Sequence, residues 1–137
     1  MKKEIIVLLL FVLTSIQTSF AQKIELKNGK ILLDKKEILS YKKANEGIEF
    51  TIYKLNTEEE ELFVITNNTQ IVGFTTNYYT KIKFQKLKLK LETSIVKETW
   101  RKFVEWLYDN KVFNDNGEFN KEKVELFIEK YDEKILN

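Results

Sequence analysis

The chain has 137 residues, 43% of them hydrophobic, and its 23 basic and 21 acidic side chains leave a net charge of +2. A chain of this size and composition can bury one packed core but not two. It contains no cysteine, histidine or proline, which excludes a disulfide scaffold, thiol or imidazole catalysis, and the usual zinc, haem and iron–sulfur sites. We therefore expect one domain with no metal and no cofactor.

The first 21 residues have the three regions of a signal peptide. A short basic start precedes an apolar run from Ile5 to Ile16, and Ser19 and Ala21 supply small residues at the −3 and −1 positions of a cleavage site. The run is shorter than the ~20 apolar residues of a membrane-spanning helix. We expect residues 1–21 to be removed and residues 22–137 to be exported to the periplasm or secreted, with no membrane span. The alternative is a buried N-terminal helix of a cytosolic domain.

From residue 23 to residue 91, apolar residues recur with the period of two that is typical of strands. Asn28-Gly29 is a strong signal for a type I′ hairpin turn. The run Leu62-Phe63-Val64-Ile65 is continuous, which favours a central strand covered on both faces. Further turns are expected at 67–69 and 75–77, and one long final strand from Tyr79 to Leu91. The pattern predicts an antiparallel β-meander of about six strands over residues 22–91.

After Glu92 the period changes to 3.6, which predicts two helices over residues 92–137. Thr93 or Ser94 can cap the first helix, whose apolar face includes Val96, Trp100 and Phe103, and Trp100 and Phe103 should be buried at the junction with the sheet. Asn120 caps the last helix. The segment 114–117 predicts a tight turn between the helices, because its spacing lacks the carboxylates of a calcium-binding hand. The chain is therefore expected to form one α+β domain, with a helical hairpin packed on one face of the meander.

The most distinctive feature of the sequence is the separation of its charges. Four glutamates stand together at Glu58 to Glu61, and between residues 81 and 90 every charged residue is a lysine: Lys81, Lys83, Lys86, Lys88 and Lys90. The alternation slips by one at Gln85-Lys86, which suggests a bulge that keeps the lysines on one face. These lysines are our candidate binding residues for an acidic protein, an anionic glycan or a lipid headgroup. The alternative is a solvated edge strand whose lysines prevent edge-to-edge pairing.

A second candidate site consists of the aromatic residues Tyr78, Tyr79 and Trp106, which could form a stacking platform for a sugar. The alternative is that they lie at the edge of the core. No nucleic-acid partner is expected, because the net charge is low and the chain has one arginine. Catalytic residues cannot be assigned, since no nucleophile elbow or phosphate-binding loop occurs and no two acids are paired by their spacing.

The segment Phe20-Ala21-Gln22, followed by Lys27-Asn28-Gly29, resembles small exported proteins of flavobacteria and other Bacteroidetes. These proteins have a leader that ends in Ala-Gln and then a Lys-Asn-Gly hairpin. The resemblance implies export from the cytoplasm and assigns no activity and no functional family.

These observations lead to three functional hypotheses. The first is an exported, non-enzymatic interaction domain that binds a protein partner, as an inhibitor or immunity protein does. The second is a binding module of the cell envelope for an anionic or sugar ligand. The third is a small hydrolase that depends on carboxylates. An exposed, flat charged surface favours the first, a concave pocket lined by the aromatic residues the second, and two converging buried acids the third.

Overall fold

The computed structural model describes residues 22–136, so the expected signal peptide lies outside the described residues. The described part contains seven strands, a 3₁₀ turn at Asn45–Gly47 and two helices. In chain order they are β1 (Ile24–Lys27), β2 (Lys30–Leu33), β3 (Lys36–Ala44), β4 (Glu49–Lys54), β5 (Glu60–Val72), β6 (Thr75–Phe84), β7 (Leu89–Thr93), α2 (Trp100–Asp109) and α3 (Lys121–Tyr131).

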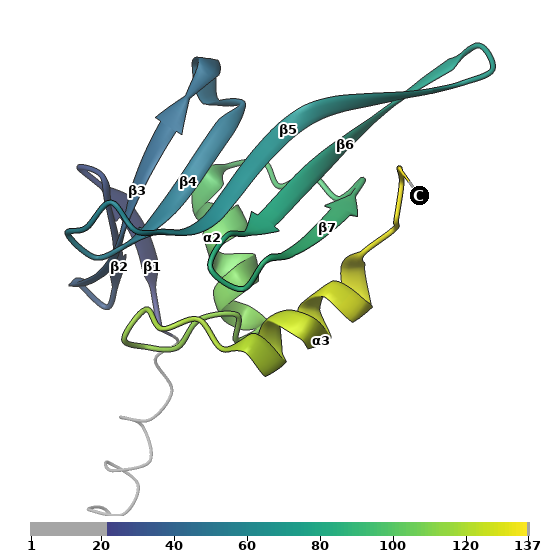
Figure 1. Cartoon of the computed structure of the whole chain (residues 1–137). Helices are drawn as coiled ribbons and strands as arrows, with labels where there is room; N and C mark the ends of the chain where they lie inside the picture. The colour runs from purple at the N-terminus through teal and green to yellow at the C-terminus, as the bar shows by residue number, and fades with distance from the viewer. Residues whose placement is uncertain (1–21, 137) are drawn as a thin grey trace, which may run out of the picture.

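The strands form one antiparallel sheet in the order β1-β2-β3-β4-β5-β6-β7, with every strand beside its neighbour in the sequence (Figure 1). The first hairpin turns at Asn28 and Gly29, whose φ angles of 51° and 76° are those that a type I′ turn requires. The two helices follow the sheet and contact it. The expected α+β fold, an antiparallel meander followed by two helices, is confirmed.

The second half of the sheet differs from the expected arrangement in three places. The segment Asn67-Asn68-Thr69 is not a turn, because β5 continues through it with a bulge between Ile65 and Asn68. The chain reverses instead at Gly73 and Phe74, where Gly73 has φ of 62°. The expected long strand from Tyr79 to Leu91 is wrong, since it is split into β6 and β7 by a turn at residues 85–88.

Both helices are capped, but α2 begins later than expected. The Thr99 side chain accepts a hydrogen bond from the backbone N–H of Lys102, so Thr99 is the cap in place of Thr93 or Ser94. Residues 94–99 connect β7 to α2, and Val96 is 75% exposed and not part of the apolar face. The cap of α3 was predicted correctly, because the Asn120 side chain accepts from the backbone N–H of Lys123.

The hydrophobic core lies between the sheet and the two helices. Phe103 of α2 packs against Phe50 of β4, and Phe127 of α3 packs against Phe84 of β6. Phe103 is 5% exposed and Trp100 is half-buried, with its ring stacked on Phe50 at 4.6 Å between centroids. Since α2 contacts β1 and α3 contacts β7, the helices link the two edges of the sheet.

The residues after α3 fasten the end of the chain to β7. The Glu133 backbone N–H donates to the Glu92 carbonyl oxygen at 2.8 Å, and the Glu92 N–H donates to the Asp132 carboxylate at 3.0 Å. The Glu133 carboxylate in turn accepts from the Thr93 hydroxyl and from the backbone N–H of Ser94. These contacts explain why Thr93 and Ser94 do not cap α2.

Candidate functional site

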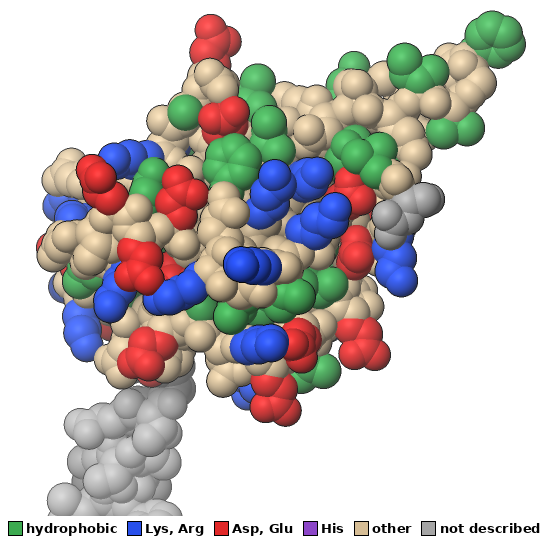
Figure 2. All heavy atoms as spheres, viewed as in Figure 1, with side chains coloured by type: hydrophobic (Ala, Val, Ile, Leu, Met, Phe, Trp, Pro, Cys, Tyr) green, Lys and Arg blue, Asp and Glu red, His purple; other side chains and the backbone are tan. Residues whose placement is uncertain are grey.

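One face of the sheet carries no helix, because α2 and α3 both pack on the opposite face. The strand registers place one residue of each strand from β3 to β7 side by side on this open face: Lys42, Thr51, Phe63, Lys83 and Lys90. A neighbouring row contains Glu49, Ile65, Lys81 and Glu92. Figure 2 looks onto this face and shows basic side chains gathered over β6 and β7 beside apolar ones. We call this surface the open face.

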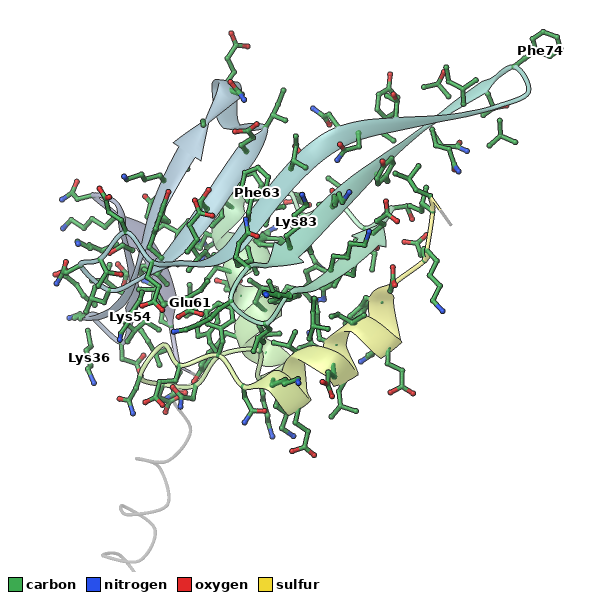
Figure 3. The ribbon with its side chains drawn as sticks, viewed as in Figure 1. Lys36, Lys54, Glu61, Phe63, Phe74 and Lys83 are labelled. Atoms are coloured by element: carbon green, nitrogen blue, oxygen red, sulfur yellow. The ribbon has the colours of Figure 1, made fainter. Side chains whose placement is uncertain are left out.

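Three of the five candidate lysines, Lys81, Lys83 and Lys90, lie on the open face. Lys83 lies between Phe63 on β5 and Lys90 on β7, directly opposite both, and Figure 3 shows the labelled Lys83 beside Phe63. Within residues 22–136, none of the three forms an ion pair within 4.0 Å. Like charges placed directly opposite on neighbouring strands destabilise a sheet. The Lys83–Lys90 pair therefore lowers the stability of the sheet locally, so strand pairing is not the reason that two lysines stand at these positions.

Lys86 and Lys88 do not join this group, because they lie in the turn between β6 and β7. The predicted bulge at Gln85-Lys86 is replaced by that turn, in which Lys88 has φ of 55°. The Lys86 ammonium lies 2.6 Å from the Glu59 carboxylate and 3.7 Å from that of Glu61. The hydrogen bond between them raises the pKa of Lys86 and lowers the pKa of Glu59. The acidic run thus compensates Lys86 and does not reach the open face. There Lys81 lies opposite Glu92 without forming an ion pair, while Lys83 and Lys90 face each other.

Aromatic residues complete the open face. Phe63 is half-buried at its centre, and on β4 the Tyr53 ring lies 5.2 Å from the Lys42 ammonium. The expectation that β5 is covered on both faces at residues 62–65 is wrong, because Leu62 and Val64 are fully buried while Phe63 and Ile65 are not. A continuous apolar run could not reveal this, since all four of its residues are apolar whichever face they occupy.

Tyr78 and Tyr79 lie beside a small pocket on the side of the sheet that carries the helices. The pocket has a volume of about 220 Å³, and Ile95, Trp100 and Phe103 line it together with the two tyrosines. Tyr78 is 63% exposed and Tyr79 only 6% exposed. The pocket is smaller than the roughly 300–1,000 Å³ that is typical of small-molecule sites.

Trp106, the third aromatic candidate, lies in the core between the two helices. It is 9% exposed, and its ring packs against Phe127 and Tyr131 of α3. The Lys97 ammonium lies 4.9 Å from the ring centroid. The tryptophan that lines the tyrosine pocket is instead Trp100, whose indole N–H donates to the Gly47 carbonyl oxygen.

The sequence analysis did not single out the end of the β5–β6 hairpin, which extends beyond the rest of the sheet (Figure 1). Three large apolar side chains there are exposed: Ile71 by 74%, Val72 by 58% and Phe74 fully. The sequence does contain a signal for this segment, because no charged residue occurs from Leu62 to Thr80. We call residues 66–80 the arm.

Neither a metal-ligand group nor a known relative assigns a function to the described residues. In the part of the chain that the structure describes, no three acidic side chains are grouped so that they could hold a metal ion. No helix of residues 22–136 has the length and apolar character needed to cross a membrane. Comparison of the chain with protein-family models, with curated proteins and with solved structures gives no match. The function is therefore argued from the geometry of the chain itself.

Proposed function

We propose that this protein is an exported, non-enzymatic interaction domain that binds an acidic protein partner through its open face. Export rests on the signal-peptide pattern of residues 1–21. Binding rests on the lysines of the open face. An inhibitor or an immunity protein works in this way, by covering a surface of its partner.

The observation that carries the proposal is the placement of Lys83 directly opposite Lys90, with no carboxylate within 4.0 Å of either among residues 22–136. An acidic partner removes this repulsion when it binds. Phe63 lies next to Lys83 and supplies an apolar contact. Interfaces of this kind combine an aromatic anchor with charges that steer the partner.

The size of the open face favours a protein over a small ligand. The row from Lys42 on β3 to Lys90 on β7 crosses five strands, and at about 4.8 Å between strands it spans roughly 19 Å. A surface of that width suits a protein interface, which buries about 800 Å² on each partner.

A binding module for a sugar or an anionic ligand is the second candidate. It is favoured by the pocket beside Tyr78 and Tyr79, whose volume of about 220 Å³ suits a small group. The third hypothesis, a carboxylate-dependent hydrolase, has less support. A general acid needs a raised pKa, whereas hydrogen bonds lower the pKa of each carboxyl group whose pKa is shifted: Glu59, Glu98, Asp115 and Glu133.

The proposal is tested by retention on immobilised poly-L-glutamate, which stands in for an acidic protein surface, with heparin as an anionic glycan. We compare Lys81→Gln/Lys83→Gln/Lys90→Gln with the control Lys27→Gln/Lys43→Gln/Lys121→Gln, which removes the same charge from exposed lysines away from the open face. We expect only the first variant to leave poly-L-glutamate at lower salt than the wild type. Equal elution of the two variants contradicts the proposal, and retention on heparin alone favours the glycan ligand.

A further inference from the structure

The arm is a two-stranded ribbon that leaves the body of the protein. The pairing of β5 with β4 ends at Ile65, and the pairing of β6 with β7 ends at Thr80, so beyond these residues β5 and β6 pair only with each other. The base of the arm still packs on the body, because Tyr79 is 6% exposed and the Gln70 amide donates to the Ile135 carbonyl oxygen at 2.6 Å. The tip, Ile71 to Phe74, is exposed, and a two-stranded ribbon without further packing is marginally stable in water. A partner or a surface that covers the tip would therefore stabilise the arm.

The apolar side chains at the end of the arm surround it on all sides. Ile71 and Val72 are successive residues of β5 and so point to opposite faces of the ribbon, and Phe74 projects from the turn between the strands (Figure 3). A flat protein surface can cover only one of these faces. An environment that encloses the tip from every direction, such as the interface of a lipid bilayer with the acyl chains beneath it, contacts all three.

The chemistry of the arm changes in order along its length. Behind the apolar tip come uncharged polar residues, Thr75, Thr76 and Asn77, and behind these the exposed ring of Tyr78. The first charged residue on β6 is Lys81, and Figure 2 shows no charged side chain along the arm. This order follows the depth profile of a bilayer, in which hydrocarbon gives way to a polar interface that favours tyrosine and then to the charged surface.

The open edges of the ribbon limit how deeply the arm can enter a bilayer. Unpaired backbone groups cannot lie in hydrocarbon without a large cost. Only the turn around Gly73 and Phe74 can therefore reach the acyl chains, and the strands behind it remain in the hydrated interface. From Ile65, which pairs with Lys81, to Val72 the arm is roughly 23 Å long at about 3.3 Å per residue. The interface behind the acyl chains is only roughly 5–8 Å thick, so Lys81 remains outside it, at a distance from the charged surface comparable to the about 8–10 Å over which the surface potential decays.

From these observations we infer that the tip of the arm, Ile71 to Phe74, inserts into the surface of an anionic lipid bilayer. Lys81, the lysine nearest to the tip, adds a screened attraction to the charged headgroups. The inference goes beyond the proposed function, because the apolar tip that carries it lies outside the open face, although Lys81 belongs to both.

The test is flotation with lipid vesicles, using the chain that begins at Gln22. This chain is the expected mature protein, and the apolar run from Ile5 to Ile16 would bind lipid by itself. Vesicles contain phosphatidylglycerol and phosphatidylcholine in equal parts, or phosphatidylcholine alone. The tip variant is Ile71→Thr/Val72→Thr/Phe74→Ser. The control is Val96→Thr/Leu126→Gln, which changes two other exposed apolar side chains.

We expect the wild type and the control to float with the anionic vesicles, and the tip variant to bind at least about tenfold more weakly. Neutral vesicles and high salt should each weaken binding of the wild type. In a Phe74→Trp variant, the tryptophan emission should shift to the blue when anionic vesicles are added.

Three results overturn the inference. The first is a wild type that does not float. The second is a tip variant that floats as the wild type does, or a Phe74→Trp emission that does not shift, because either shows that the tip stays in water. The third is a dimer that forms without lipid and is lost in the tip variant, measured by light scattering, since the tip is then covered by a second copy of the chain.

Discussion

Gly117, in the turn between the helices, lies directly against the backbone of Ile38 on β3. A Cβ atom at this position would collide with the Ile38 carbonyl oxygen and come within 3.0 Å of the Leu39 Cγ. Gly117 also has φ of 76°, and its N–H donates to the Asn114 carbonyl oxygen at 2.9 Å. The predicted turn thus has a second role, because it brings the connection between the helices onto the sheet.

We expect Gly117→Ala to lower the free energy of unfolding by about 2–4 kcal/mol, from the strained φ and the collision together. Gly73→Ala is the matched control. Gly73 has φ of 62° but nothing within 4 Å of its Cβ position, so only the conformational cost of about 1–2 kcal/mol applies. Urea unfolding of both variants checks the difference, and equal losses would contradict a close contact at Gly117.

Trp100 joins α2 to the sheet by stacking and by one hydrogen bond. Its ring lies 4.6 Å from that of Phe50 at an angle of 10°, and its indole N–H donates to the Gly47 carbonyl oxygen at 3.2 Å. Trp100→Phe keeps the stacking, so we expect it to cost about 1 kcal/mol, whereas Trp100→Ala should cost about 3 kcal/mol. Val96→Ala, at an exposed position in the same region, should change the stability by less than about 0.5 kcal/mol. Chemical denaturation measures the stability of all three variants. If Trp100→Ala lowers the free energy of unfolding no more than Val96→Ala does, the stacking on Phe50 does not contribute to stability.

The parts of the fold that depend on local chemistry could be predicted from the sequence. The Asn28-Gly29 hairpin is one, because its backbone angles suit few other residue pairs. The Asn120 cap is another, since its oxygen needs only the N–H of Lys123, three residues ahead. The change of period after Glu92 correctly separated the sheet from the helices.

The parts that depend on distant contacts could not be predicted. Thr93 and Ser94 are good capping residues, but both bond to Glu133, about forty residues away. The lysine pattern of residues 81–90 predicted one strand, because the alternation slips only once. The chain turns instead at residues 85–88, where Lys86 forms an ion pair with Glu59 of the acidic run. Within the candidate site, three of the five lysines share a face, and only the strand register shows which three.

Lys86 should differ from the lysines of the open face in binding experiments. It is already paired with Glu59 and Glu61 in the turn. We expect Lys86→Gln to elute from poly-L-glutamate at nearly the salt concentration of the wild type, while Lys83→Gln elutes earlier. Because the ion pair is exposed, Lys86→Gln should also leave the urea midpoint of unfolding nearly unchanged. If Lys86→Gln weakens retention as much as Lys83→Gln does, the basic site extends into the turn.

The contact between Glu133 and β7 should depend on pH. Hydrogen bonds from the Thr93 hydroxyl, then from the N–H and hydroxyl of Ser94, lower the pKa of Glu133 from its usual value of 4.5. The folded state therefore favours the carboxylate. The stabilising contribution is complete above pH 4.5 and is lost as the pH falls through the lower pKa of the folded state.

Glu133→Gln should accordingly be less stable than the wild type at pH 7, by about 1 kcal/mol or less because the group is exposed. The difference should shrink as the pH falls below 4.5, since protonation removes the same interaction from the wild type. Urea unfolding of both proteins between pH 7 and acid pH measures this stability difference. Limited proteolysis reports whether residues 132–136 detach from β7. Glu129→Gln, an exposed position on α3, serves as the control. A stability difference that grows toward acid pH would contradict the assignment, because it would mean that the protonated side chain makes the contact.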